Sequence, residues 1–232
     1  MMERMVKPEI LDTLPPGDPA AAANLRDLRL LNRLMGNWRW AARILRRRLR
    51  PGDHVLEAGA GLGDLGRELR RNVPELRTCR YTGLDLRQRP ADWPAAWDWR
   101  QGDLLDLDIS PAPQVLLINF LLHQFTDLQL DRIGRSIAGI PVWIFCEPYR
   151  SRLPMVALAL LRPLGLHPIT GHDGRVSIQA GFRGRELADR LGAGVGRTTE
   201  ITVDPRGSYR LVSGERMAAL PASSANDCRP GR

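Results

Sequence analysis

The sequence is poor in cysteine and lysine, only 6% of its residues are aromatic, and no long apolar run occurs in it. The three cysteines, Cys79, Cys146 and Cys228, are an odd number without close spacing. They exclude a disulfide-stapled scaffold and a cysteine-based zinc site, and they fit a reducing compartment. The most apolar stretch, Leu153 to Leu166, contains an arginine and a proline and is shorter than the ~20 residues that span a bilayer. With no N-terminal signal pattern, we expect a cytoplasmic protein without a membrane partner.

The charge balance is basic, with 34 Lys and Arg against 26 Asp and Glu and a formal net charge of +8. Clustered Lys and Arg bind nucleic acids because they release counterions from phosphates. Here every basic residue except Lys7 is an arginine, and acids are interspersed among them. The one dense cluster, residues 43 to 50, ends an expected helix, where positive charge interacts favourably with the helix dipole. Nucleic acid is therefore not the expected partner.

The length of 232 residues and the hydrophobic content of 43% suit a single domain with a sizeable core. Residues 1–23 are rich in Pro and Ala and predict an irregular arm. Asn24 is the expected N-cap of a helix, and a second helix follows Gly36 to about Leu49. We therefore divide the chain into an arm with lid helices over 1–50, a main domain over 51–214, and a disordered tail over 215–232.

The main domain alternates strands and helices, which predicts an α/β fold with a parallel sheet covered on both faces. Thr126 and Gln129 form a capping-box signature at the start of one helix. After Cys146 we expect an apolar helix over 152–161, a loop over 163–174, a short helix over 184–191 and a C-terminal antiparallel hairpin over 198–203 and 208–212. The expected parallel strands are 54–58, 79–85, 97–101, 115–118 and 141–146.

The first strand runs directly into a glycine-rich segment, Glu57-Ala58-Gly59-Ala60-Gly61-Leu62-Gly63. Parallel sheets bind ligands at the carboxyl ends of their strands. Glycines at that position make the tight strand-to-helix turn and let the backbone approach a ligand closely. The spacing Gly61-x-Gly63-x-x-Gly66 also matches the dinucleotide fingerprint, so the glycines alone do not name the ligand.

Acidic residues near the ends of successive strands narrow the choice of ligand. Asp85 ends the second strand, where a carboxylate can accept both hydrogen bonds of a ribose diol. Asp103, after Gly102 at the end of the third strand, can accept from an adenine amine. Glu57 would repel a pyrophosphate and attract a ligand that carries a sulfonium and an ammonium. This pattern favours S-adenosylmethionine over a nicotinamide dinucleotide.

The segments that carry the pattern are Val55 to Gly63, Asp85, Gly102-Asp103 and Asn119. Together they resemble the successive motifs of class I S-adenosylmethionine-dependent methyltransferases, and the resemblance covers roughly residues 50 to 150. The resemblance implies a Rossmann-like fold with a mostly parallel seven-stranded sheet, a C-terminal antiparallel hairpin and N-terminal helices. It also implies the cofactor and its contacts, with no metal. By resemblance, the methionine portion of the cofactor is lined by Gly59, Gly61 and Gly63, and the ribose is bound by Asp85. The adenine is contacted at its edge by Gly102 and Asp103 and on its faces by Leu86 and Leu104. The edge near the sulfonium is lined by Asn119 and Phe120.

Two further comparisons with known families concern the acceptor. Residues 119–125 depart from the aromatic-bearing tetrapeptides of enzymes that methylate base nitrogens, so we do not expect that activity. Residues 147–151, 171–173 and 177–187 resemble bacterial small-molecule methyltransferases found beside type III polyketide synthases. That resemblance implies methylation of a phenolic or polyketide-like small molecule at oxygen, with methylation at carbon left open.

Methylation of a hydroxyl needs alignment and a proton acceptor, and histidine is the natural base near neutral pH. His172, followed by Asp173, and His123, just beyond the fourth strand, are the catalytic candidates. Their structural alternatives are a loop contact for His172 and a helix cap for His123, whereas His54 and His167 are expected to be structural. Three other functions stay open: a degenerate cofactor-binding partner protein, an RNA methyltransferase and a nicotinamide oxidoreductase. The acceptor and the oligomeric state are also open.

Overall fold

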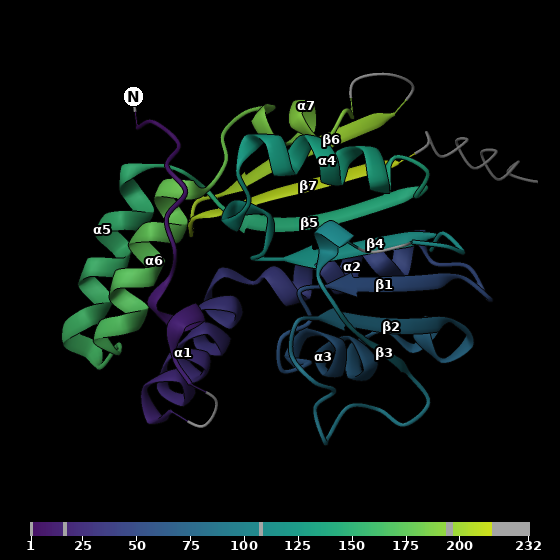
Figure 1. Ribbon diagram of the computed structural model, residues 1–232, viewed down its shortest axis with the longest axis horizontal. Coiled ribbons are helices and arrows are strands. Elements are labelled where there is room, and N and C mark those ends of the chain that lie inside the picture. Colours follow the sequence, from purple (N-terminus) through teal and green to yellow (C-terminus); the bar gives the residue numbers. More distant parts are fainter. Residues whose placement is uncertain (1, 16–17, 107–108, 194–196, 215–232) are drawn as a thin grey trace, which may run out of the picture.

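A seven-stranded mixed sheet forms the centre of the computed structural model, which describes residues 2–15, 18–106, 109–193 and 197–214 (Figure 1). The strand order is β3-β2-β1-β4-β5-β7-β6. The first five strands in this order pair in parallel, and β7 pairs antiparallel with both β5 and β6. The predicted α/β fold and C-terminal hairpin are confirmed. The strands are β1 (His54–Ala58), β2 (Arg80–Asp85), β3 (Asp98–Gln101), β4 (Val115–Asn119), β5 (Val142–Pro148), β6 (Thr198–Asp204) and β7 (Ser208–Gly214).

Helices connect the strands and precede the sheet. They are α1 (Pro19–Met35), α2 (Asn37–Arg48), α3 (Asp64–Asn72), α4 (Asp127–Ile137), α5 (Arg152–Leu161), α6 (Pro168–Ala180) and α7 (Glu186–Arg190). Short 3₁₀ turns include η1 (Ile10–Thr13), η2 (Pro74–Thr78), η3 (Leu104–Asp106), η4 (Leu122–Gln124) and η5 (Arg162–Leu164). The capping box of α4 is present as predicted, because the Thr126 hydroxyl accepts from the Gln129 N–H and the Gln129 side chain accepts from the Thr126 N–H.

Alternate residues of the central strands build two separate cores, one on each face of the sheet. On one face, Leu56, Leu116 and Phe145 pack with apolar residues of α4 and α7. On the other, Val55, Val115 and Ile144 pack with apolar residues of α2 and α3. Helix α2 therefore belongs to the layer that covers the sheet.

A group of helices lies beyond the carboxyl ends of the parallel strands, on the left of Figure 1. It contains α1, α5, α6 and the N-terminal arm, residues 2–14. Helices α5 and α6 pack closely because glycine faces the contact. A Cβ on Gly174 would lie 2.8 Å from Leu158 Cδ2. These elements cover the edge of the sheet where a ligand is expected.

Two predicted boundaries are wrong. Helix α1 begins at Pro19, not after Asn24, because Asp18 is its N-cap and accepts from the Ala20 N–H at 2.7 Å; proline suits the first helical turn. The expected loop over 163–174 contains the start of α6, where His167 is the N-cap. Helix packing against α5 outweighs the low helix propensity of two glycines there. The predicted tail lies outside the described residues.

Within the described residues, no helix combines the length and the apolar character that crossing a bilayer requires.

Candidate active site

The turn after β1 depends on glycine at three alternate positions. Gly59, Gly61 and Gly63 have φ angles of 72°, 57° and 76°, which other residues adopt only with strain. A Cβ on Gly59 would lie 3.0 Å from Leu121, and one on Gly63 would lie 2.6 Å from Trp93. A Cβ on Gly61 would meet nothing within 4 Å. Gly61 is thus the position where the backbone faces open space at the carboxyl edge of the sheet.

Asp85 connects the turn after β1 to the turn after β2. One carboxylate oxygen accepts from the Gly61 N–H at 2.6 Å, and the other accepts from the Arg87 N–H at 2.9 Å. The side chain is only partly buried. Each carboxylate oxygen can accept more than one hydrogen bond, so Asp85 keeps capacity for a ligand hydroxyl.

The end of β3 lies next to Asp85. The Gly102 N–H donates to the Asp85 carbonyl at 2.9 Å, and Asp103 accepts from the Leu105 N–H at 2.9 Å. Leu86 is 67% exposed, a high value for leucine, and so offers an apolar surface at this edge. Leu104 is 5% exposed and packs in the core beneath α4, so its side chain is not free to cover a ligand face as expected.

The end of β4 combines an unusual backbone conformation with an unpaired polar atom. Phe120 has a φ of 58°, which is uncommon for a bulky residue and indicates local strain. Asn119 Nδ2 donates to Asn32 Oδ1 of α1 at 3.1 Å. Asn119 Oδ1 is buried and has no hydrogen-bond partner among the described residues. That oxygen is therefore an unsatisfied acceptor at the end of β4.

Glu57 does not present a charge at this edge, which corrects the sequence argument. Its side chain is buried against α3, and Oε2 accepts from the Tyr81 hydroxyl at 2.6 Å. Burial raises the pKa of Glu57 to about 8, although the Tyr81 hydrogen bond acts in the opposite direction. Glu57 is therefore largely protonated at neutral pH. Its charge cannot exclude a pyrophosphate, and the choice of ligand depends on the other residues.

His123 is buried between two carboxylates. Nδ1 lies 2.8 Å from Glu147 Oε2, and Nε2 lies 3.3 Å from Glu9 Oε1. Burial alone would lower the pKa of His123, but the hydrogen bonds to Glu147 and Glu9 outweigh it and raise the pKa to about 9. The imidazolium has no free lone pair at neutral pH. In this arrangement His123 positions its neighbours, and its catalytic role stays a prediction.

The alternative expectation for His123, a helix cap, is wrong, because Thr126 caps the following helix. Glu147 and Glu9 were not identified as site residues from the sequence. Glu147 also accepts from the N–H groups of Leu121, Leu122 and His123, and so fixes the segment after β4. Glu147 follows the apolar residues 142–146 within β5, and a lone acid at that point of a strand is a detectable signal. Glu9 lies in the arm, and nothing local marks it.

His172 and Asp173 lie on α6, and their side chains do meet. His172 Nδ1 is 3.0 Å from Asp173 Oδ1. Asp173 is buried and also accepts from the N–H groups of Ile10 and Leu11 at 2.9 and 3.0 Å, so it anchors the arm. The His172 side chain is about half exposed and lines a cavity between α5, α6 and the arm. The catalytic role predicted for the pair is not tested by this geometry.

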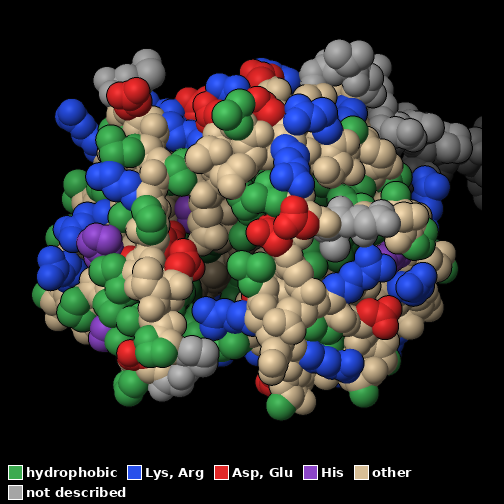
Figure 2. Space-filling model, in the orientation of Figure 1, with side chains coloured by type: hydrophobic (Ala, Val, Ile, Leu, Met, Phe, Trp, Pro, Cys, Tyr) green, Lys and Arg blue, Asp and Glu red, His purple; other side chains and the backbone are tan. Residues whose placement is uncertain are grey.

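Helix α1 and the arm cover the carboxyl edge of the sheet. Besides the Asn32 contact to Asn119, Arg29 of α1 forms an ion pair with Asp64 at the start of α3, with an N–O distance of 2.6 Å. In Figure 2 the surface is hollowed near the centre of the view, where Figure 1 places the boundary between these helices and the strand ends. A ligand at this edge would lie beneath α1.

The other two histidines have structural contacts. His54 Nε2 lies 2.8 Å from the Thr82 hydroxyl, and His167 Nδ1 accepts from the Ile169 N–H.

Comparisons with known proteins establish the fold. No protein-family model matches the chain, and no curated protein matches its sequence. The chain is similar to the plantazolicin methyltransferase BpumL in complex with a triazolic desmethylPZN analog and SAH, with a TM-score of 0.66 and 9% identity over 89% of this chain and 93% of that one.

Two further solved structures are similar. The human N-acetylserotonin methyltransferase in complex with SAM has a TM-score of 0.52 and 14% identity over 88% of this chain and 61% of that one. An O-methyltransferase family protein from Burkholderia thailandensis has a TM-score of 0.56 and 17% identity over 87% of this chain and 60% of that one. The chain has the fold of class I methyltransferases, as its motifs predicted.

Proposed function

We propose that this protein is an S-adenosylmethionine-dependent methyltransferase that acts on a small molecule. The proposal depends mainly on one observation, the hydrogen bond between Asp85 and the Gly61 N–H, which joins the two turns expected to hold the cofactor. The neighbouring turns and the fold of the similar methyltransferases support the same conclusion.

The residues present fit this cofactor. Gly61 leaves open space where a Cβ would stand, Asp85 can accept from a ribose hydroxyl, and the buried Asn119 Oδ1 lacks a donor. The exposed Leu86 can pack on an adenine face, and Asp103 can accept from its amine. When bound, S-adenosylmethionine supplies an electrophilic methyl group. The chain's own residues then hold the adenosine over β2 and β3 and leave the end of β4 for the acceptor.

The acceptor class is part of the proposal. Helix α1 and the arm act as a lid, because the contacts of Asn32, Arg29 and Glu9 hold them over the carboxyl edge of the sheet. A covered site suits a small molecule better than a folded polymer. The resemblance of residues 147–187 to methyltransferases found beside type III polyketide synthases supports a phenolic or polyketide-like acceptor and methylation at oxygen.

Calorimetric titration of the purified protein with S-adenosylhomocysteine tests the cofactor. Micromolar binding is expected. Asp85→Asn should weaken it by at least about tenfold, because a charged acceptor for a ribose hydroxyl contributes about 1.5 to 3 kcal/mol. Asp106→Asn is the control, since Asp106 is 76% exposed and pairs only with Arg132 among the described residues. No binding at high micromolar ligand would contradict the proposal.

A panel of phenols and polyketide-like acceptors with methyl-labelled cofactor tests the reaction. Label in an ether product supports O-methylation, and label in an acid-stable carbon product supports C-methylation. Cofactor binding without any transfer would instead favour the degenerate binding protein. Label in RNA, with binding that falls steeply as salt rises, would favour the RNA methyltransferase.

A further inference from the structure

Three buried polar side chains connect the N-terminal arm with the segment that follows β4. Glu9 of the arm, His123 of η4 and Glu147 of β5 are only 9%, 3% and 0% exposed, so water has little access to their contacts. The His123 imidazole lies between the two carboxylates, with Nδ1 2.8 Å from Glu147 and Nε2 3.3 Å from Glu9. We refer to these three side chains as the buried cluster.

The charges within the buried cluster match. Burial by itself would raise the pKa of Glu9, but the hydrogen bond and the charge of His123 outweigh it and lower the pKa. An imidazolium donates from both ring nitrogens and therefore satisfies both carboxylates at once. Removing one partner from a buried ion pair leaves a charge without compensation. The contact with His123 therefore fixes where Glu9, and with it this part of the arm, lies.

The other end of the buried cluster reaches the proposed cofactor site. Glu147 accepts from the N–H groups of Leu121 and Leu122 at 3.1 and 2.8 Å. The Leu121 side chain packs against the turn after β1, since a Cβ on Gly59 would lie 3.0 Å from it. The preceding residue, Phe120, has the positive φ of 58°. The cluster thus holds a strained backbone segment that contacts the glycine turn.

Other contacts hold the arm independently of the buried cluster. Arg4 forms an ion pair with Asp127 of α4, with an N–O distance of 2.7 Å, and also donates to two carbonyls of the segment before α4. Asp173 of α6 accepts from the N–H groups of Ile10 and Leu11. The arm therefore keeps anchors on both sides of Glu9 when the contact between Glu9 and His123 is removed.

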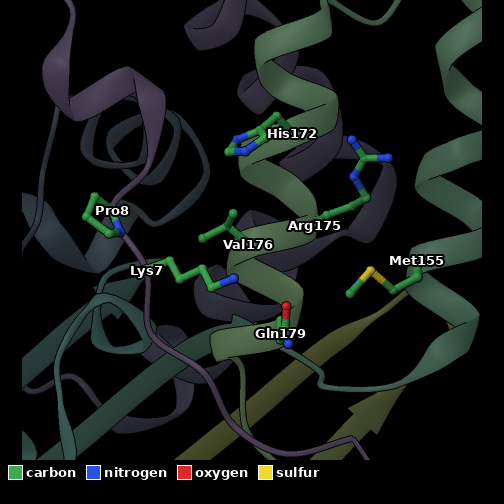
Figure 3. Close-up of a pocket in the computed structure, with 7 residues that line it drawn as sticks. All are labelled: Lys7, Pro8, Met155, His172, Arg175, Val176 and Gln179. Carbon is green, nitrogen blue, oxygen red and sulfur yellow. The ribbon is translucent and has the colours of Figure 1, made fainter.

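Between these anchors the arm is not packed tightly against α6. A cavity of about 510 Å³ lies between them, and its lining includes Lys7 and Pro8 of the arm and His172 of α6. Figure 3 shows the arm passing beside α6 at this level, with the Lys7 side chain extending towards the helix. The cavity adjoins Glu9 in the chain, so the position of this part of the arm depends strongly on the buried cluster.

We propose that Glu9 and His123 are positioning residues that couple closure of the arm to binding of the cofactor. This inference rests on the proposed methyltransferase function. With the cluster intact, the closed arm supports residues 120–122 in the conformation that the cofactor meets. Both residues act through Glu147 and the backbone that it holds. Coupling between two sites is reciprocal, so whatever affinity the closed arm adds for the cofactor, the cofactor adds to closure of the arm.

Hydrogen exchange and calorimetry on the full-length protein test the coupling, with S-adenosylhomocysteine as the ligand. The reporters are the N–H groups of Met5, Ile10 and Leu11, which donate to α6 and not to the buried cluster. In the parent, saturating ligand should slow their exchange at least about fivefold, the lower end of the usual coupling between sites. In Glu9→Ala this slowing should disappear, and the affinity for the ligand should fall by a similar factor.

Two matched variants control for the loss of an arm contact in general. Glu3→Ala removes an exposed acid of the same arm that forms no ion pair within the described part of the chain. Ser177→Ala removes the hydrogen bond from α6 to Glu9 and leaves His123 in place. Both variants should keep the slowing by ligand. Thermal unfolding of each variant checks that it is folded.

A double variant tests whether Glu9 acts through His123. His123→Gln should also abolish the slowing. Adding Glu9→Ala to it should weaken ligand binding no further, because both changes break the same connection.

The proposal is overturned if the ligand binds the parent but leaves the exchange of the three amides unchanged, or if either control variant loses the slowing as fully as Glu9→Ala. It is also overturned if Glu9→Ala weakens binding as much in His123→Gln as in the parent. Absence of ligand binding to the parent would be a different result, because it would contradict the proposed function and this inference with it.

Discussion

At the scale of single residues, burial changes what an acid does. Glu57 precedes the glycines, where an exposed carboxylate would attract a cationic ligand. In the folded protein the same side chain lies beneath α3, accepts from Tyr81 and has a pKa of about 8. A carboxyl group that is protonated in the folded state and ionised in the unfolded state makes stability fall as pH rises.

Glu57→Gln tests this protonation state. The folded pKa of Glu57 is raised, so its contribution to stability is complete below about pH 4.5 and is lost as pH rises through about 8. Between these values the parent should lose up to about 1.4 kcal/mol of unfolding free energy per pH unit relative to the glutamine variant. Urea unfolding of both proteins from pH 5 to 9 measures it. A difference that does not vary with pH would show that Glu57 is ionised in the folded protein.

Gly61 and Gly52 allow a controlled test of the cofactor site, with Gly61 in the proposed site and Gly52 as the control outside it. Both have positive φ, 57° and 87°, and a Cβ on either would meet nothing within 4 Å. Alanine at either position should therefore destabilise the fold similarly, by about 1 to 2 kcal/mol. Only Gly61→Ala should lose binding of S-adenosylhomocysteine, at least tenfold by calorimetry, because only that Cβ would project into the proposed site. Equal affinity of the two variants would place the ligand elsewhere.

At the scale of elements, the position of the N-terminal arm depends on distant parts of the chain. It has one short 3₁₀ turn, η1, and is held by side chains of α6 and of the segment after β4. Asp173 fixes two of its backbone N–H groups, and Glu9 contacts both His123 and Ser177. The part of the proposed lid formed by the arm is thus attached by polar contacts to α6 and to the segment after β4.

Asp173→Ala and His172→Ala test whether Asp173 anchors the arm independently of His172. The first change leaves the N–H groups of Ile10 and Leu11 without their acceptor, which should destabilise the arm by at least about 2 kcal/mol. Hydrogen exchange at these two amides should accelerate by at least tenfold. His172→Ala removes a half-exposed partner and should change stability by less than about 1 kcal/mol. Should both variants protect the two amides as the parent does, Asp173 is not the anchor.

At the scale of the whole molecule, two buried groups make the protein sensitive to alkali. The folded pKa of His123 is raised to about 9, so its stabilising contribution is complete below about pH 6.5 and is lost as pH rises through 9. Glu57 loses its contribution from about pH 4.5 up to 8. The two effects overlap between pH 6.5 and 8.

We therefore expect the contributions of Glu57 and His123 to make the free energy of unfolding fall most steeply between pH 6.5 and 8. The His123 contribution is on the order of 3 kcal/mol. Chemical denaturation across this range measures the profile. In His123→Gln the decline between pH 8 and 9 should disappear. A profile that is flat from pH 6.5 to 9 would contradict the buried pairing of His123 with Glu147 and Glu9.

The sequence by itself determined the order of the strands and of every long helix except α6, the C-terminal hairpin, and the positions of the glycines and of Asp85 at the carboxyl edge. These features depend on hydrophobic periodicity, on capping residues such as Thr126, and on the rule that parallel strands end at one edge. Sequence reasoning missed α6, because its two glycines lower helix propensity and only packing against α5 compensates.

The tertiary structure alone decided the protonation of Glu57 and the contacts of His123. Glu9 and His123 are 114 positions apart, and no local pattern relates them. Likewise, only the fold shows that Leu104 is core and that α5 leaves three apolar side chains exposed. The physical reason is the same in each case: local structure follows from neighbouring residues, whereas charge state, pairing and exposure depend on which distant groups exclude water.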